Sequence, residues 1–555
     1  MQNNLPKITI GPIIGKVDEN SARILIEIDQ EIELTINLKE IEEIEEQSTF
    51  SITNLCTPKY PKVFKFIGLK PYTRYEVIIE NKLDYLNPEL KELKSKFRTT
   101  SANDGISPDK FNLGFISCNS SNYYKNLENP EFSLWENLSQ KVKSEDINYL
   151  IHMGDQIYLD DGFWNGEKNN CFSKAFELWN EAYKRSYGKE YGKERKNSKN
   201  SDLNKEYNSK KIDENFKKEK VILEKEIIEI ISNEYREAWN IKPCADALRN
   251  SPNLMILDDH EIYDDFGFDG KYDPNDMEIF ENFFADKARF CYYKYQKQLA
   301  DDVDFESYPI AEKEHHSHII NGVGLFVQDF RGCFTWLKDY NYKGTKGKLD
   351  DFFGKSQSEE IKNCFGKGGK FEKTKFAFYI SANPLVFFSS MVTNLAKEKV
   401  NDCYEHWAFA ARNEQAELLD ILVDFKKNNK IETMLISGDV HIGCYTSIFK
   451  DDEYILKQMI TSPISQKPPT NFEMKVMNLL RFSQNELANG YVFVHSTGIN
   501  ECNYGLVELR LSLMGEKYNA NAKHIKSNGK RFEEDDVEDI NTVYKKPCCT
   551  NCQII

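Results

Sequence analysis

The sequence predicts an all-β sandwich at its N-terminal end, followed by a larger α/β domain. Two observations carry this prediction. Residues 7 to about 100 form short β-branched and aromatic runs separated by turn residues, which is typical of antiparallel strands. From residue 108 onward the apolar runs are continuous and alternate with stretches of helical spacing, as expected for strands that are covered on both faces.

The N-terminal strands are expected at “KITIGPIIGKV”, “SARILIEID”, “IELTINL”, “KVFKFIGLK”, “RYEVIIENK” and “SKFRTT”. The stretch “GLKPYTRYEVIIE” resembles the corner of a fibronectin type III domain, where a Tyr closes the turn between two sheets. This resemblance makes Tyr75 a core residue. We expect residues 1–102 to form a fibronectin- or immunoglobulin-like domain that carries no chemistry of its own.

The second domain is expected to span residues 108–515. Its strands are predicted at “FNLGFIS”, “INYLIHM”, “NLMIL”, “VGLFVQDF”, “KFAFYIS” and “TMLIS”, and its helices include “EFSLWENLSQKVKSE” and “NEQAELLDILVDFKKNN”. Residues 185–233 are highly charged, so we predict a solvated insertion that is helical in part near “VILEKEIIEIIS”. Residues 516–555 are expected to be a polar tail.

Composition narrows the class of protein. The chain carries 73 Lys and Arg against 89 Asp and Glu, a net charge of −16, which argues against nucleic-acid binding and suits cation binding. No apolar stretch approaches the length of a membrane-spanning helix, and the N-terminus does not read as a signal peptide. The 13 cysteines are scattered and odd in number, so we expect reduced thiols in a cytoplasmic protein.

Four of the apolar runs end in side chains that bind metals. “GFIS” leads to Cys118, and “YLIHMGD” ends at Asp155 with Tyr158 three residues later. The other two runs, “LMILDDHE” and “LISGDVH”, end in a longer set: Asp258, Asp259, His260, Glu261, Asp439 and His441. In open α/β sheets, ligands bind outside the carboxyl ends of the strands, so these groups are expected to meet.

Several carboxylates gathered at one edge repel one another unless cations lie between them, so the pattern predicts bound metal. Carboxylate oxygens suit hard divalent ions, whereas a thiolate and a phenolate suit a softer or trivalent ion such as iron. The mixed donor set indicates two unlike metals that share one bridging carboxylate.

The spacing of these motifs resembles that of the alkaline phosphatase D (PhoD-like) metallophosphatases, within the calcineurin-like metallophosphoesterase superfamily. The resemblance runs from 111 to about 510 and rests on “ISCNSS”, “HMGDQIYLDD”, “YREAWNIKPCADALRNSPNLMILDDHEIYDDFG”, “VQDFRG”, “HWAFAARNEQAELLDIL”, “ISGDVHIG” and “NYGLVEL”. It implies two packed mixed sheets flanked by helices, and a hydroxide activated by two metals that attacks the phosphorus of a phosphate ester.

The resemblance also implies a role for each matching residue. Cys118, Tyr158 and His441 match the ligands of a first metal, which is iron, Fe(3+), in the family. Asp155 matches the carboxylate that bridges the two metal sites.

Asp259 and Asp439 match the ligands of a second metal, which is calcium, Ca(2+), in the family; other divalent ions are an alternative. His260 matches the histidine that donates a proton to the leaving group. Arg331 is a candidate for contact with the phosphate, or for pairing with Asp329.

Two other functions compete with phosphomonoester hydrolysis. One is a phosphodiesterase that acts on phospholipid or nucleotide diesters. The other is a catalytically degenerate, lipid-anchored adaptor, which is favoured by a departure from the family pattern: Glu405 and His406 precede Trp407 where the family often has Asp.

The final residues “CQII” fit a prenylation box at Cys552, with Cys548 and Cys549 as candidate palmitoylation sites. Such a lipoprotein would attach to the cytoplasmic face of a membrane. The alternatives are an unmodified tail and half of a zinc site. Two further histidine patterns, His152 and “HHSH” at 315–318, are interpreted as a hydrogen-bonded core residue and as part of a polar loop.

Overall fold

The structure is a computed structural model of the chain. It describes residues 5–41, 49–102, 107–162, 169–187, 214–266, 279–305, 314–332, 349–389, 412–471, 474–475, 485–535 and 538–544. Among these residues, no helix combines the length and the apolar character needed to cross a membrane.

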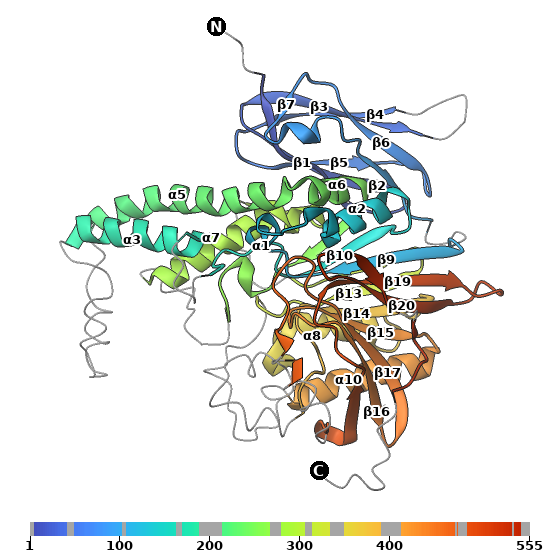
Figure 1. Ribbon diagram of the computed structural model, residues 1–555. Helices are drawn as coiled ribbons and strands as arrows, with labels where there is room; N and C mark the ends of the chain where they lie inside the picture. Colours follow the sequence, from blue (N-terminus) through green and yellow to red (C-terminus); the bar gives the residue numbers. More distant parts are fainter. Residues whose placement is uncertain are drawn as a thin grey trace, which may run out of the picture.

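Two four-stranded sheets form the N-terminal part, which lies at the top of Figure 1. Their inward side chains make one apolar core that includes Ile24, Leu34 and Phe64. The hydroxyl of the buried Tyr75 accepts a hydrogen bond from the Lys70 amide at 3.0 Å, which is the corner that the sequence predicts. The strand orders are β5(Lys62–Ile67)-β2(Ser21–Ile28)-β1(Lys7–Val17)-β7(Asp84–Tyr85) and β4(Thr49–Cys56)-β3(Ile32–Glu40)-β6(Arg74–Ile79)-β8(Lys96–Arg98).

The other residues that the structure describes are built on two seven-stranded mixed sheets, which confirms the predicted fold class. In the first sheet, β22(Glu538–Asp539) pairs with β20 beside the main order β11(Asn253–Ile256)-β10(Tyr149–Met153)-β9(Lys110–Ile116)-β19(Cys502–Leu511)-β20(Tyr518–Ser527)-β21(Phe532–Glu534). The second sheet has the order β12(His316–Ile320)-β13(Val323–Val327)-β14(Phe376–Ser381)-β15(Thr433–Ser437)-β17(Glu453–Ile460)-β16(Cys444–Lys450)-β18(Tyr491–His495).

The strands that precede the candidate ligands are parallel to their neighbours. β10 lies between β9 and β11, with Ile151 opposite Phe115 on one side and Leu254 on the other. In the second sheet β13, β14, β15 and β17 are also mutually parallel. Parallel strands place their carboxyl ends at the same edge, so each sheet delivers its strand ends to one rim.

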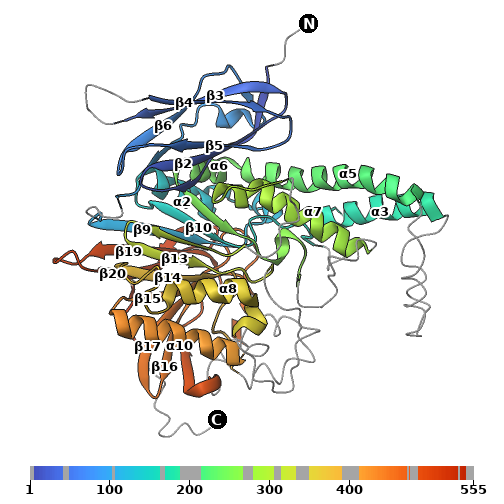
Figure 2. The same ribbon diagram turned by 180° about the vertical axis from the view of Figure 1, so that it is seen from behind.

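The two sheets pack face to face through a large apolar core, in which the rings of Phe115 and Phe378 are 5.5 Å apart. Both views show the second sheet between the first sheet and the helices α8(Leu349–Phe365) and α10(Arg412–Asn429). Helices α2(Leu134–Lys143) and α6(Lys242–Asn250) lie between the first sheet and the N-terminal sandwich (Figure 2). The remaining short helical segments are α1(Ser121–Lys125), Pro88–Leu90, Pro130–Phe132, Asp259–Glu261, Lys297–Leu299 and Ala488–Gly490.

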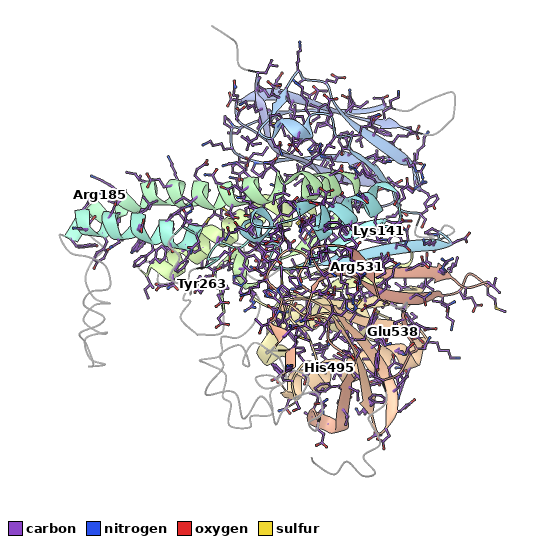
Figure 3. All side chains as sticks on the ribbon, viewed as in Figure 1. Lys141, Arg185, Tyr263, His495, Arg531 and Glu538 are labelled. Carbon is purple, nitrogen blue, oxygen red and sulfur yellow. The ribbon has the colours of Figure 1, made fainter. Side chains whose placement is uncertain are left out.

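Three helices project from the body as an arm: α3(Cys171–Tyr187), α5(Glu214–Trp239) and α7(Phe280–Tyr295). Arg185, labelled at the far end of the arm in Figure 3, pairs with Glu219 at 2.8 Å. The charged stretch of the sequence is therefore not solvated throughout, because α5 buries Leu223, Ile227 and Ile231 in the main core.

The N-terminal sandwich is joined to the arm by a buried polar network. Glu27 has no exposed surface and accepts hydrogen bonds from Arg236 Nε at 2.6 Å, Tyr295 Oη at 2.6 Å and Thr9 Oγ1 at 2.7 Å. The apolar core of the two large sheets also includes Ile13 of β1. The sandwich is thus packed against the rest of the protein through both apolar and ionic contacts.

Candidate metal centre

The predicted site residues come together at the carboxyl ends of strands from both large sheets. Cys118, Asp155 and Asp259 follow β9, β10 and β11 of the first sheet. Arg331 and Asp439 follow β13 and β15 of the second sheet. The site therefore lies on the seam between two sheets, which the order of motifs along the chain does not reveal.

Two glycines allow the sheets to approach at this seam. A Cβ at Gly438 would lie 2.7 Å from the Ser117 Cβ, and a Cβ at Gly154 would overlap the Asp258 Cβ and lie 3.3 Å from the Ala382 Cβ. Gly154 also has φ of +88°, a conformation that a side chain disfavours. Glycine is thus required for the close approach on which the site depends.

Four of the candidate ligands have left-handed backbone conformations. Their φ angles are +56° at Cys118, +56° at Asp155, +67° at Asp439 and +55° at His441. Non-glycine residues adopt this region in only a few per cent of cases, and the cost is of the order of 1 kcal/mol or more for each. Backbone strain of this kind clusters at functional sites, and here it recurs at four candidate ligand positions.

The acidic side of the site is compact. Asp155, Asp258, Asp259 and Asp439 each offer an oxygen, and these oxygens all lie within 4.8 Å of one another. Burial first, and the neighbouring acids second, raise the pKa of Asp439 well above its ordinary value, and burial likewise raises the pKa of Asp155. Without a cation Asp155 and Asp439 would hold protons to higher pH, and a bound cation would replace these protons. For Asp259, burial raises the pKa, but Arg331 and His260 outweigh burial and lower it.

The other side of the site combines a thiol, a phenol and an imidazole around Asp155. Its Oδ2 accepts from the Tyr158 hydroxyl at 3.0 Å and lies 3.5 Å from the Cys118 Sγ. The Tyr158 oxygen is 3.3 Å from His441 Nε2. Burial raises the pKa of Cys118 and of Tyr158, with Asp155 adding to both, and burial lowers the pKa of His441 to about 4.

Arg331 contacts the acids from the buried side of the site, away from solvent. Its guanidinium pairs with Asp258 and lies 3.4 Å from Asp259 Oδ1, and its side chain has no exposed surface. Asp329 Oδ1 accepts from the backbone amides of Arg331 at 2.9 Å and Gly332 at 2.8 Å. Burial raises the pKa of Asp258 to about 6 even though Arg331 opposes the shift.

His260 occupies the open side of the site, with 20% of its side chain exposed. Its Nδ1 lies 2.7 Å from Asp160 Oδ1, and its ring stacks on Tyr158 with centroids 4.1 Å apart. Burial lowers the pKa of His260, but Asp160, Asp259 and Asp155 outweigh it and leave the pKa well above the ordinary value. The imidazole is therefore held in its protonated form to higher pH.

The sequence reasoning missed the supporting roles of two residues, Asp160, which it did not single out, and Glu261, which it named only among the possible metal ligands. Asp160 accepts from His260 and, through Oδ2, from the Asp264 amide at 2.7 Å. Glu261 accepts from the amides of Asp155 at 3.0 Å and Asp258 at 2.7 Å, and so fixes two loops. Both lie inside quoted motifs, but only contacts between distant segments reveal their roles.

The histidines His152, His316 and His318 bond to groups other than the candidate metal ligands. His152 is buried and bonds to Gln156 Oε1 and Asn253 Oδ1, both at 2.8 Å, as a core residue should. The 315–318 stretch was expected in a polar loop, which is wrong: His316 and His318 belong to β12 and bond to each other at 2.8 Å. The sites 405–407, 548, 549 and 552 fall outside the described residues.

Comparison with known proteins assigns the family. Residues 113–509 match the family model described as PhoD-like phosphatase. The chain belongs to the PhoD-like phosphatase family. No curated protein matches this chain.

A solved structure of PhoD aligns with this PhoD-like phosphatase with a TM-score of 0.56 and 13% sequence identity, covering 98% of this chain and 94% of that one. This likeness shows the fold. The sensor domain of the anti-sigma factor RsgI4 in Pseudobacteroides cellulosolvens is 18% identical over 18% of this chain and all of its own, with a TM-score of 0.12.

The donor set of this PhoD-like phosphatase fits metal ions. Four clustered carboxylates face one guanidinium, and further acidic oxygens of Asp264 and Asp265 lie near Asp259. The excess of negative groups in a largely buried site is the condition under which bound cations stabilise carboxylates. The arrangement offers oxygen donors on one side and softer donors on the other, with Asp155 between them.

Proposed function

We propose that this PhoD-like phosphatase hydrolyses phosphate esters with the help of two metal ions. The observation that supports the proposal is the meeting of four carboxylates with a thiol, a phenol and an imidazole at one sheet seam. Bound cations would stabilise the ionised forms of these neighbouring buried acids, whose negative charges repel one another.

In this proposal Cys118, Tyr158 and His441 hold the first ion, and Asp155 contributes to both sites. The thiolate and the phenolate suit ferric iron. Asp155 is suited to the shared position because its carboxyl belongs both to the acidic group and to the cluster around the Tyr158 hydroxyl.

Asp259 and Asp439 hold the second ion, for which their oxygen donors suit calcium. When bound, the ions neutralise the charge of the phosphate group and make a water nucleophilic near neutral pH. We assign Arg331 a positioning role, because its buried guanidinium neutralises the acids behind the site.

His260 is proposed to give its proton to the oxygen of the leaving alcohol. It is exposed enough to meet a substrate, and Asp160 holds Nδ1, so Nε2 is the nitrogen that faces the reaction. Proton donation by a positioned side chain contributes about 10²- to 10⁴-fold in rate.

The test is hydrolysis of p-nitrophenyl phosphate and bis(p-nitrophenyl) phosphate, with and without chelator, together with elemental analysis of the protein. We expect two kinds of ion and chelator-sensitive hydrolysis. Asp155→Asn should lose metal and activity together, whereas the control Asp452→Asn, on an exposed turn, should retain both. Full activity in metal-free protein would overturn the proposal.

The same panel separates the competing functions. A higher rate on the diester would favour the phosphodiesterase. Two bound metals without hydrolysis of either ester would favour the degenerate adaptor. The lipid anchor rests on “CQII” alone, and unchanged membrane partitioning of Cys552→Ser in cells would remove it.

A further inference from the structure

A cavity of about 290 Å³ lies where the N-terminal sandwich meets the first large sheet, and we name it the junction cavity. The sandwich contributes Tyr72, from the turn before β6, Arg74 of β6, and Lys96 and Arg98 of β8 to the lining. Glu145, at the end of α2, and Lys110 of β9 are among the lining residues on the other side. None of the candidate metal ligands lines it.

The strand register concentrates positive charge at this cavity. β6 and β8 are antiparallel, and Arg74 lies directly opposite Arg98. Their neighbours Tyr75 and Phe97 turn into the sandwich core, so the two arginines share the outer face. Like charges placed directly opposite one another destabilise a strand pair, so an anion near the two arginines would relieve the repulsion. Arg98 also donates to the Tyr72 carbonyl at 3.3 Å and lies over the Tyr72 ring.

Glu145 supplies one carboxylate from across the junction. Its Oε2 lies 2.6 Å from Arg74 Nη2 and 3.5 Å from Arg98 Nη2. Glu145 has a φ of +61°, which is an unfavourable conformation for a glutamate. One carboxylate therefore serves two guanidiniums, and the charge is only half compensated.

A third cation adds to the excess. Lys110 also lines the cavity, but Glu508, which lies outside the lining, neutralises its charge at 2.9 Å. Glu76, opposite Lys96 in the register, is paired with Lys94 at 3.2 Å. Among the residues that line the cavity, Arg74, Arg98 and Lys96 therefore set three positive charges against the one negative charge of Glu145, in a chain whose net charge is −16.

We propose that the junction cavity binds a small phosphate-bearing anion. Guanidinium groups match the geometry of phosphate oxygens, and an excess of two positive charges suits a dianion. The volume accommodates a phosphate group with a small organic remainder. The anion would use the donors that Glu145 now occupies, so its binding competes with the contact between Glu145 and the sandwich.

Because Glu145 and the anion would compete for the same arginines, substitutions at Arg98 and at Glu145 should change the phosphate affinity in opposite directions. Binding of radiolabelled inorganic phosphate to the metal-loaded full chain is measured by equilibrium dialysis at constant ionic strength. Arg98→Gln should weaken one class of phosphate site by about tenfold, since it removes a charge-assisted contact. Glu145→Gln should strengthen the same class by removing the competing carboxylate.

The matched control is Lys82→Gln, whose exposed side chain lies outside the cavity lining, and it should change nothing. Identical isotherms for all four proteins would overturn the proposal, and so would weaker binding in Glu145→Gln, which a purely structural ion pair predicts. Misfolding of Arg98→Gln cannot imitate the gain expected in Glu145→Gln. Acetate competing as well as phosphate would exclude a phosphate site.

Hydrolysis of p-nitrophenyl phosphate separates this site from the metal centre. The junction variants should keep the wild-type rate, because none of their residues touches the metal ligands. Loss of the Arg98-dependent class with hydrolysis intact supports the junction cavity alone. Persistence of that class in a protein without hydrolysis would contradict only the proposed function.

Discussion

Replacing Asp160 by Asn tests how His260 works. The Asp160 carboxylate is used at both oxygens, accepting from His260 Nδ1 at 2.7 Å and from the Asp264 amide at 2.7 Å. An amide of the same shape has one acceptor oxygen, so it cannot replace both contacts. A charge-assisted hydrogen bond contributes about 1.5–3 kcal/mol, so kcat should fall about 10- to 150-fold.

The loss should depend on the leaving group, because only a poor leaving group needs a proton. The assay compares kcat for an alkyl phosphate with kcat for p-nitrophenyl phosphate, at constant and measured metal content. Asp161→Asn is the matched control, since this neighbouring acid bonds to Ser120 Oγ rather than to His260. Equal losses for both substrates, or an unchanged rate on the alkyl ester, would refute the reasoning.

The other predictions concern stability and metal content. Glu27→Ala should lower the free energy of unfolding in urea by about 3–5 kcal/mol, because it leaves Arg236 partly unpaired in a buried site; the exposed Glu31→Gln should cost little, and a similar small effect for both would count against the network. Burial lowers the pKa of His524 to about 4 from about 6.5, so only the unfolded chain takes up a proton between these values, and stability should fall by about 3 kcal/mol as pH drops from 6.5 to 4. His524→Gln should flatten that slope in urea titrations at several pH values, and an unchanged slope would exclude this histidine as its source. Cys118→Ser should lower the iron content more than the calcium content in elemental analysis, since it removes the soft donor; parallel loss of both ions would argue against separate sites.

The fold was largely predictable because continuous apolar runs require cover on both faces. The runs that contain Phe115, Ile151, Leu254 and Met434 are all buried strands. The partition of these strands between two sheets was not predictable, since local pattern carries no information about which strand lies beside which. The exact domain boundaries stay a prediction.

Two errors came from judging burial by polarity. His316 and His318 look like loop residues, but the two imidazoles satisfy each other within a strand. The charged stretch before Trp239 looks solvated, yet Leu223, Ile227 and Ile231 recur at helical spacing and are buried. Sparse apolar residues are enough to pack a helix when their spacing is right.

The residues of the candidate metal centre were predictable from the sequence, and the contacts that support them were not. Cys118, Asp155 and Asp439 were found because each ends an apolar run. Asp160 acts only through contact with another segment, and the left-handed backbone of the ligands leaves no mark in the residue types. The roles assigned to the individual ligands stay predictions.

The division of donors between two sheets has a thermodynamic consequence. The first large sheet positions four of the candidate ligands, and the second positions two. They are Cys118, Asp155, Tyr158 and Asp259 after strands of the first sheet, and Asp439 and His441 after β15 of the second. Ions bound by ligands from both groups would link the two sheets, so the sheets could not separate without losing the bound ions. Because the ions would bind the folded chain, the free energy of unfolding should rise with the free ion concentration. At low metal concentration, the fold would therefore lose stability and the enzyme would lose activity.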